Sequence, residues 1–181
     1  MIYFLSGKSG AGKDLVASYL NKKYGFKVFR FADPIKRYTA DLTVTSLLDC
    51  QFKKNKVPKD MGDLDWDLGQ YQQKIGSAFR KELHPKIFIF HLWKKMKNTD
   101  WTKAVIVDGR LKNEYNFFVG KKAKTIRLNR DFELRKRFLG KRDPNHITEI
   151  DLDDAVFDYV IENNYTEKKA LFREVDKIVK K

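Results

Sequence analysis

The sequence predicts a three-layer α/β/α fold, in which helices cover both faces of a five-stranded parallel sheet. Short apolar runs alternate with longer segments of helical periodicity along the 181 residues. A helical segment lies between successive strand candidates, which favours parallel pairing through crossover connections. A glycine-rich turn also joins the first strand to the first helix. The strand candidates are residues 2–5, 27–32, 104–107, 124–129 and 159–161.

The glycine-rich turn carries the most specific motif in the chain. Residues 7–13 fit the pattern G-x-x-x-x-G-K between the first strand and a helix expected over 13–24, which Gly25 ends. Such a turn aims backbone N–H groups at an anion, and the helix adds the positive end of its dipole. A chance match in a turn of Gly and Lys is the weaker interpretation. We expect P-loop NTPase-type binding of a nucleoside triphosphate by Gly7, Ser9, Gly10, Ala11, Gly12, Lys13, Asp14 and Leu15, with Lys13 on the β- and γ-phosphates.

Two acids are candidate ligands of Mg²⁺. Asp14 stands where the motif usually has Ser or Thr, and a carboxylate beside a triphosphate is tolerable chiefly with a cation between them. Alternatively, Asp14 only favours the dipole of its helix, and the sequence does not rank the two roles. Asp108 ends the third strand at the edge where parallel sheets bind ligands, which suits a Walker-B-like acid. Its alternative role is to cap the next helix, which runs to Gly120.

Residues 33–100 form a largely helical insertion, which would bind the phosphoryl acceptor beside the loop. Lys36 and Arg37 lie in the first turn of a helix that follows Asp33 and Pro34, where a bound anion would relieve their conflict with the dipole. A solvated face is the alternative. Further helices are expected over 67–83 and 86–96, and residues 50–66 as a mobile surface loop. The inward faces of the two helices are predicted to be Leu68, Tyr71, Ile75, Ala78 and Phe79, and Ile87, Phe90, Leu92 and Trp93.

The stretch after the fourth strand is the richest in arginine. Helical periodicity over 131–139, broken at Gly140 and at Asp143-Pro144, indicates a helix-loop lid over 130–150. Guanidinium groups suit the oxygens of a transferred phosphoryl group, although an exposed helix is the plainer interpretation. Thr148 and Asp151 have the spacing of a helix cap. The arginines of this stretch are Arg127, Arg130, Arg135, Arg137 and Arg142, and which of them acts in catalysis is left open.

The last helix is expected to begin near Thr166 and Glu167 and to end in lysines that complement its dipole. Its buried face is predicted to consist of Leu171, Phe172, Val175, Ile178 and Val179.

The composition limits the class of partner. The net charge is +14 and the hydrophobic content 42%. A basic chain attracts polyanions, but this charge is dispersed and accompanies no nucleic-acid-binding signature, so mononucleotides are favoured and nucleic acid is not excluded. No apolar run reaches the length of a membrane span. The single cysteine, Cys50, suits a packed thiol in a reducing, cytoplasmic compartment.

Six segments, taken in order, make the chain similar to the deoxynucleoside monophosphate kinases of phages and related viral or bacterial genomes. They are GKSGAGKD at 7–14, FADPIK at 31–36, QKIGS at 73–77, VDGRLKNE at 107–114, HITE at 146–149 and VIEN at 160–163. The resemblance implies Mg²⁺-dependent transfer of the ATP γ-phosphoryl group to a deoxynucleoside monophosphate, in the host cytoplasm if the source is viral. It implies that arginines near Arg130 and Arg135 neutralise the charge of the phosphoryl group during its transfer. It gives no role to His146 or Glu149. It implies an acceptor site lined by Lys36, Gln73, Arg80, Asp108, Arg110 and Glu114, to which we add Asp33 and Arg37 as further candidates.

Other functions remain open at this point. A small-metabolite kinase of the dephospho-coenzyme A or phosphomevalonate type would change only the acceptor. A nucleic-acid-stimulated P-loop ATPase would use the positive charge, and a regulatory module would bind nucleotide without turnover. We expect one domain over 1–181, compatible with a homodimer. It would have a core (1–32, 104–129, 157–181), an acceptor-binding region (33–100) and a lid (130–150).

Overall fold

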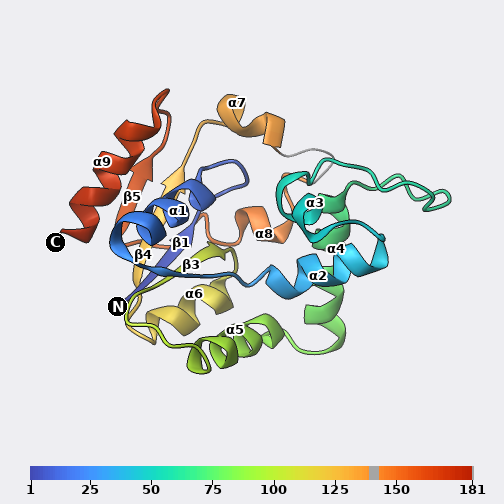
Figure 1. Cartoon of the computed structure of the whole chain (residues 1–181), viewed down its shortest axis with the longest axis horizontal. Coiled ribbons are helices and arrows are strands. Elements are labelled where there is room, and N and C mark those ends of the chain that lie inside the picture. Colours follow the sequence, from blue (N-terminus) through green and yellow to red (C-terminus); the bar gives the residue numbers. More distant parts are fainter. Residues whose placement is uncertain (139–142, 181) are drawn as a thin grey trace.

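The computed structural model, which describes residues 1–138 and 143–180, is built on a five-stranded parallel sheet of order β2-β3-β1-β4-β5 (Figure 1). Strand β1 lies at the centre, between β3 and β4. The first strand of the chain is therefore buried on both edges and both faces. The strands are β1 Ile2–Ser6, β2 Lys27–Phe29, β3 Ala104–Gly109, β4 Lys124–Asn129 and β5 Tyr159–Glu162.

Helices lie on both faces of this sheet, and further helices stand beside it (Figure 1). The sheet-covering helices are α1 Lys13–Tyr24 and α9 Lys168–Val179 on one face, and α5 Ile87–Lys97 and α6 Lys112–Val119 on the other. The helices beside the sheet are α2 Asp33–Leu42, α3 Leu47–Phe52 and α4 Leu68–Glu82. The short helical segments are α7 Phe132–Arg135, the 3₁₀ turn η1 Lys136–Phe138 and α8 Ile147–Ile150. In the described part of the chain, no helix is both long enough and apolar enough to cross a membrane.

Alternation along β1 creates two cores. Tyr3 and Leu5 pack with α1 and α9, whereas Ile2 and Phe4 pack with α5 and α6. Successive side chains of a strand point to opposite faces, so this apolar strand needs a helical layer on each side. The predicted three-layer α/β/α fold with five parallel strands is confirmed.

The second strand is shorter than the sequence predicts. It ends at Phe29, because the backbone N–H groups of Phe31 and Ala32 donate to the two carboxylate oxygens of Asp108, at 2.8 and 2.9 Å. These N–H groups are therefore not available to the sheet. The alternative role of Asp108 as a cap of the next helix is wrong, since Glu114 accepts the N–H groups at the start of α6.

The insertion contains a helix that the sequence analysis assigned partly to a loop. Cys50, placed in that loop, lies in α3 and packs with Ala40 of α2 and Leu68 of α4 in a small core of its own. The buried thiol agrees with the expected packing role. Only residues 53–66 of the predicted loop follow α3 and precede α4.

Two helical faces differ from the prediction. Phe90 is 49% exposed, and the buried residues of α5 are instead Phe88, Ile89, Leu92 and Met96. Four consecutive apolar residues open this helix, so periodicity alone cannot choose which of them face inward. Ala78 of α4 is also exposed. The predicted apolar face of α9 is confirmed at Leu171, Val175 and Ile178.

The lid segment also differs in detail. Its predicted single helix is a short α7 followed by the η1 turn, and Leu139, Gly140 and Arg142 lie outside the described residues. The predicted Thr148 cap is wrong. The His146 side chain caps α8, accepting from the Thr148 N–H at 3.3 Å.

Gly109 should be intolerant of a side chain, because a Cβ there would lie 2.0 Å from the ring of Phe4, which is fully buried. We expect Gly109→Ala to lower the free energy of unfolding by about 1–3 kcal/mol through overpacking, measured by urea denaturation. The control is Gly120→Ala, whose nearest neighbours are 3.4 Å away. It should change stability by less than about 0.5 kcal/mol. Equal stability of the two variants would contradict this packing.

Candidate active site

A cavity of about 580 Å³ opens at the carboxyl edge of the sheet, between the glycine-rich loop and helices α2 to α4. Ligands of open α/β sheets bind at this edge, where the first residues after several strands converge. The predicted site residues that line the cavity are Ser9, Gly10, Gly12, Lys13, Asp14, Leu15, Lys36, Gln73, Arg80, Asp108, Arg110, Glu114 and Arg130.

The loop between β1 and α1 is held in the shape of an anion cradle. Gly10 and Gly12 have φ angles of 79° and 100°, which side-chain-bearing residues rarely adopt. The Lys13 ammonium donates to the carbonyl of Gly7 at 2.6 Å and to that of Lys8 at 2.9 Å. These bonds curl the loop around its own lysine. The geometry fits a bound polyphosphate, because the loop leads directly into the N-terminus of α1 and carries the Lys13 ammonium.

Packing from two other segments supports the loop. The Asn163 amide, just after β5, donates to the Ala11 carbonyl at 2.8 Å. A Cβ on Gly10 would lie 2.8 Å from the Phe138 ring and 2.9 Å from the Arg135 Cβ. The described lid residues thus pack directly on the loop. Gly7 and Ala11 shape the loop but do not line the cavity.

Burial strongly perturbs the ammonium of Lys13. It is 7% exposed, and burial together with the nearby charge of Arg110 lowers its pKa to about 7, against the attraction of Glu149 and Asp14. The free site therefore holds this ammonium under strain, which a bound phosphate would relieve.

The two adjacent cations of α2 have different environments. Lys36 is 5% exposed and lines the cavity, and burial lowers its pKa although Asp108 and Asp33 oppose that effect. Arg37 is exposed and lies outside the cavity lining. Asp33 also lies outside it and pairs with Lys95 at 3.1 Å. The position of the two cations in the first helical turn favoured neither, whereas the family resemblance named Lys36, and the structure brings only Lys36 to the cavity.

Buried charges form a chain along one wall of the cavity. Glu149 accepts from the Ser9 N–H at 2.9 Å and pairs with Arg110. Glu114 accepts from the Arg110 N–H at 3.0 Å and pairs with Arg80 at 3.1 Å. Burial raises the pKa of Glu114 despite the charge of Arg80. This wall connects the loop to helix α4.

The two candidate metal ligands lie on the cavity but are engaged with protein groups. Asp14, whose side chain is 68% exposed, pairs with Arg30 at 3.0 Å. Asp108 holds the N–H groups of Phe31 and Ala32. No group of three or more His, Cys, Asp or Glu side chains suited to a metal occurs among the described residues. Mg²⁺ in kinases commonly takes one or two carboxylates with substrate phosphates and water, so the two acids fit that ion only beside a bound triphosphate.

The two catalytic candidates of the lid differ in position. Arg130 lines the cavity and donates to the Gly10 carbonyl at 3.3 Å, while its buried Nε has no hydrogen-bond partner in the described structure. An unpaired buried donor is costly, and a phosphate oxygen would satisfy it. Arg135 lies outside the lining, with its guanidinium 5.2 Å from the centre of the Phe132 ring.

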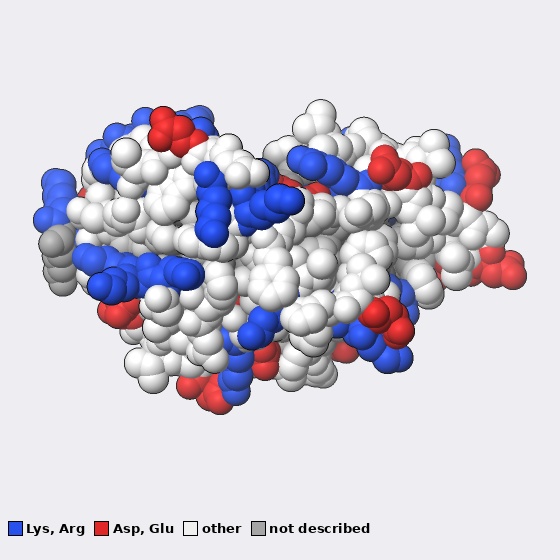
Figure 2. Space-filling model, turned by 90° about the horizontal axis from the view of Figure 1, so that it is seen from below, with Lys and Arg blue, Asp and Glu red and all other residues white. Residues whose placement is uncertain are grey.

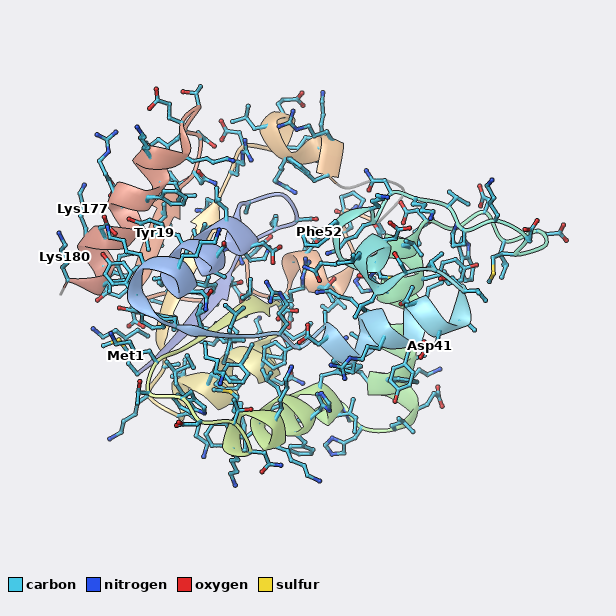
Figure 3. All side chains as sticks on the ribbon, viewed as in Figure 1. Met1, Tyr19, Asp41, Phe52, Lys177 and Lys180 are labelled. Carbon is cyan, nitrogen blue, oxygen red and sulfur yellow. The ribbon has the colours of Figure 1, made fainter. Side chains whose placement is uncertain are left out.

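Several lining residues were missed by sequence reasoning. The segment after α3 approaches the cavity because the N–H groups of Leu68 and Gly69 donate to the carbonyls of Lys56 and Lys54, at 2.9 and 2.8 Å. The high density of lysines in this segment was the sequence feature that could have indicated a phosphate-binding role. Phe52, 76% exposed, lies on the side of α3 that faces the sheet (Figure 3). The missed lining residues include Arg30, Gln51, Phe52, Lys53, Lys54, Asn55, Lys56, Gln72, Phe138, Thr148 and Glu149.

On the face seen from below, Lys and Arg form separate groups among uncharged and acidic residues (Figure 2). A nucleic-acid groove would be expected to gather cations in one stripe, and this face carries none.

No protein-family model matches the chain. A protein of Acanthamoeba polyphaga mimivirus with the curated name "Putative deoxynucleotide monophosphate kinase" is 30% identical over 179 residues, covering 90% of this chain and 88% of that protein. The chain belongs to the deoxynucleotide monophosphate kinase family. The predicted resemblance is thereby confirmed, and the protein is a phosphotransferase with a nucleotide-binding P-loop.

Solved structures agree on the fold of this kinase. Shikimate kinase from Aquifex aeolicus superposes with a TM-score of 0.54 at 14% identity, covering 99% of this chain and 96% of that one. Shikimate kinase from Acinetobacter baumannii, in complex with shikimate, gives 0.51 at 13% identity, with coverage of 98% and 91%. At such identity these matches show a shared fold alone.

Because the pKa of Lys13 is about 7 in the free kinase, nucleotide binding should depend on pH. Above pH 7 the free ammonium loses its proton, and a bound phosphate restores it. Mg-ADP affinity should therefore fall by up to about tenfold per unit between about pH 7 and 9, with uptake of about one proton. Calorimetry in two buffers of different ionisation enthalpy measures both. Lys13→Met should bind weakly without this slope, and a flat profile for the native protein would contradict the lowered pKa.

Proposed function

We propose that this kinase transfers the γ-phosphoryl group of ATP to a deoxynucleoside 5′-monophosphate, giving the diphosphate and ADP. The observation that carries the proposal is one cavity that joins the phosphate-binding loop to the cations Lys36, Arg80 and Arg110. Two phosphorylated molecules need two cationic subsites facing each other, and this cavity offers both. The mimivirus relative's name suggests the acceptor class.

The donor phosphates would lie in the loop. The backbone N–H groups of Gly10, Gly12, Lys13 and Asp14 would donate to the phosphate oxygens, and the Lys13 ammonium would contact the β- and γ-phosphates. Arg130, with its unpaired Nε beside Gly10, would neutralise charge on the transferred group. Asp14 and Asp108 would hold Mg²⁺, and the ion would supply positive charge beside the donor phosphates.

The acceptor would lie between α2, α4 and the end of β3. Lys36 and Arg110 would hold its phosphate, and Gln73 would face the rest of the nucleotide. Exposed Phe52 offers an apolar surface at the same cavity. The Asn55 amide donates to the Arg137 carbonyl at 3.3 Å, so the insertion and the described part of the lid meet. Exclusion of water between these segments would prevent loss of the phosphoryl group by hydrolysis.

We further propose that the domain is divided into a core, an acceptor-binding region and a lid. We also propose that it is compatible with a homodimer.

Turnover tests the proposal directly. We expect ADP release from Mg-ATP to rise with at least one of the four deoxynucleoside monophosphates, and Lys13→Ala to lower kcat/KM by at least about 100-fold. Parallel reactions contain ribonucleoside monophosphates, dephospho-coenzyme A, phosphomevalonate, shikimate or single-stranded DNA, with ADP measured by a coupled assay.

Each result assigns an acceptor class. Turnover with a small metabolite alone would replace the acceptor and keep the kinase mechanism. Stimulation by DNA alone, weakening steeply with salt, would overturn the proposal in favour of a nucleic-acid-stimulated ATPase.

The neighbouring cations of α2 provide a matched pair of variants. Lys36→Met should raise the acceptor KM by about 10- to 100-fold, because it removes a buried charged donor facing the cavity. Arg37→Met should leave KM within about twofold, because Arg37 is exposed outside the lining. Steady-state kinetics with the best acceptor measure both. A larger effect at Arg37 than at Lys36 would contradict the assignment.

A further inference from the structure

The segment His146-Ile147-Thr148-Glu149 has no role in the scheme above, yet it lies at the centre of the site. Helix α8, which contains Glu149, sits between the sheet and helices α3 and α4 (Figure 1). Thr148 and Glu149 both line the cavity. Glu149 is 6% exposed, and a carboxylate is rarely so buried unless it is paired.

The two oxygens of Glu149 have different partners. Oε2 accepts from the Ser9 N–H at 2.9 Å, and Oε1 pairs with Nη1 of Arg110. The same Nη1 donates to the Thr148 carbonyl at 3.1 Å. Helix α8 thus holds the Nη1 end of the Arg110 guanidinium. The same helix is joined to the backbone of the phosphate-binding loop through the Ser9 N–H.

The electrostatic surroundings of Glu149 and Arg110 keep both side chains ionised. Burial opposes ionisation of Glu149, but Arg110, the Ser9 N–H and Lys13 outweigh it and hold the pKa of the carboxyl at about 2. The charge on Glu149 in turn raises the pKa of Arg110, although the partial burial of the guanidinium opposes that effect. Both groups therefore remain charged at any pH at which the protein would act.

The other half of Arg110 has no protein partner among the described residues, and the residue lines the cavity. A guanidinium held at one edge and open at the other is suited to grip one phosphate. Arg110 has many rotamers when it is not held, so a fixed direction needs a fixed partner.

His146 extends the contact to the acceptor helix. Its Nε2 lies 3.2 Å from the Ser77 hydroxyl of α4, and its Nδ1 lies 2.9 Å from the Thr148 hydroxyl. Helix α8 therefore touches the loop, the end of β3 and α4 together.

We propose that Glu149 is a positioning residue, which uses the Ser9 backbone of the phosphate-binding loop as a fixed point and aims Arg110 at the phosphate of the acceptor. The inference rests on the proposed phosphoryl transfer and names the group that aligns its two subsites. Alignment within about 1 Å matters for in-line transfer, since misplacement on that scale costs up to about 100-fold in rate.

Variants of Glu149 can separate the orientation of Arg110 from the binding of nucleotide. The reason is that Glu149 is itself an anion beside a site for anions. Glu149→Gln removes a charge that repels phosphate and leaves Arg110 free to turn. We expect kcat to fall about 10- to 100-fold, while the Kd of Mg-ADP stays within about threefold or becomes tighter. Glu149→Asp keeps the charge but is one methylene too short to reach both partners. It should keep native Mg-ADP affinity and still lose at least about fivefold in kcat.

The experiment compares these variants with a matched carboxylate. Asp153 is also paired with a cation of the loop, Lys8, at 2.7 Å, but it lies outside the cavity lining. Asp153→Asn should leave kcat within about twofold. The double variant Glu149→Gln with Arg110→Gln should be no slower than Arg110→Gln alone, because Glu149 acts through Arg110.

Three results would overturn the inference. The first is an unchanged kcat in Glu149→Gln, and the second is Mg-ADP binding more than tenfold weaker in that variant. The third is a double variant that is slower than Arg110→Gln by the same factor by which Glu149→Gln is slower than the native protein.

A readout without turnover separates this inference from the proposed function. In ¹⁵N spectra of the arginine guanidinium groups, the Arg110 signal, identified from its absence in Arg110→Gln, should be sharp and slow in hydrogen exchange. It should broaden in Glu149→Gln and not in Asp153→Asn. If no deoxynucleotide is an acceptor and the signal behaves in this way, the acceptor assignment fails and the positioning role stands. If the signal is the same in all forms, the positioning role fails.

Discussion

The parallel pairing of β1 with β3 on one edge and β4 on the other is the constraint on which the rest of the structure depends. It aligns Ser6 with Gly109, so the loop after Ser6 and the turn after Asp108 emerge side by side although about a hundred residues separate them. The helices on the two faces then bury β1 completely. Every group of the candidate site is positioned relative to this edge of the sheet.

A concentration of charge inside the molecule is the second feature. Lys13 and Lys36 are buried and Arg110 is partly buried, with Asp108, Glu114 and Glu149 as the nearby acids, and burial lowers the pKa of both lysines. Packed apolar residues would be more favourable here for folding alone. A site that must hold two phosphorylated molecules gains from the same arrangement, because the cations are already desolvated and fixed before the anions arrive. The lowered pKa of Lys13 is thus a stability cost connected to phosphate binding.

Where sequence reasoning succeeded, the signal was local. Glycines at fixed spacing, an apolar first strand and a terminal amphipathic helix each depend on residues within one segment, and each was found in the structure. Where it failed, distant residues decided the outcome. The second strand ends early because Asp108 takes its N–H groups, and α5 turns Phe90 outward because the sheet receives Phe88 and Ile89. His146 replaces Thr148 as a cap through its own side-chain geometry.

The sequence by itself determined the fold class, the phosphate-binding loop and the family, because these follow from periodicity and from an ordered set of short motifs. Tertiary structure decided which of two adjacent cations enters the cavity. Lys36 and Arg37 are adjacent and chemically alike, yet the packing of α2 turns one inward and the other to solvent. It also brought Glu149 onto the loop, about 140 residues away, and onto Arg110. A contact between buried charges depends on how three segments pack together, and the spacing of residues in any one of them does not encode it.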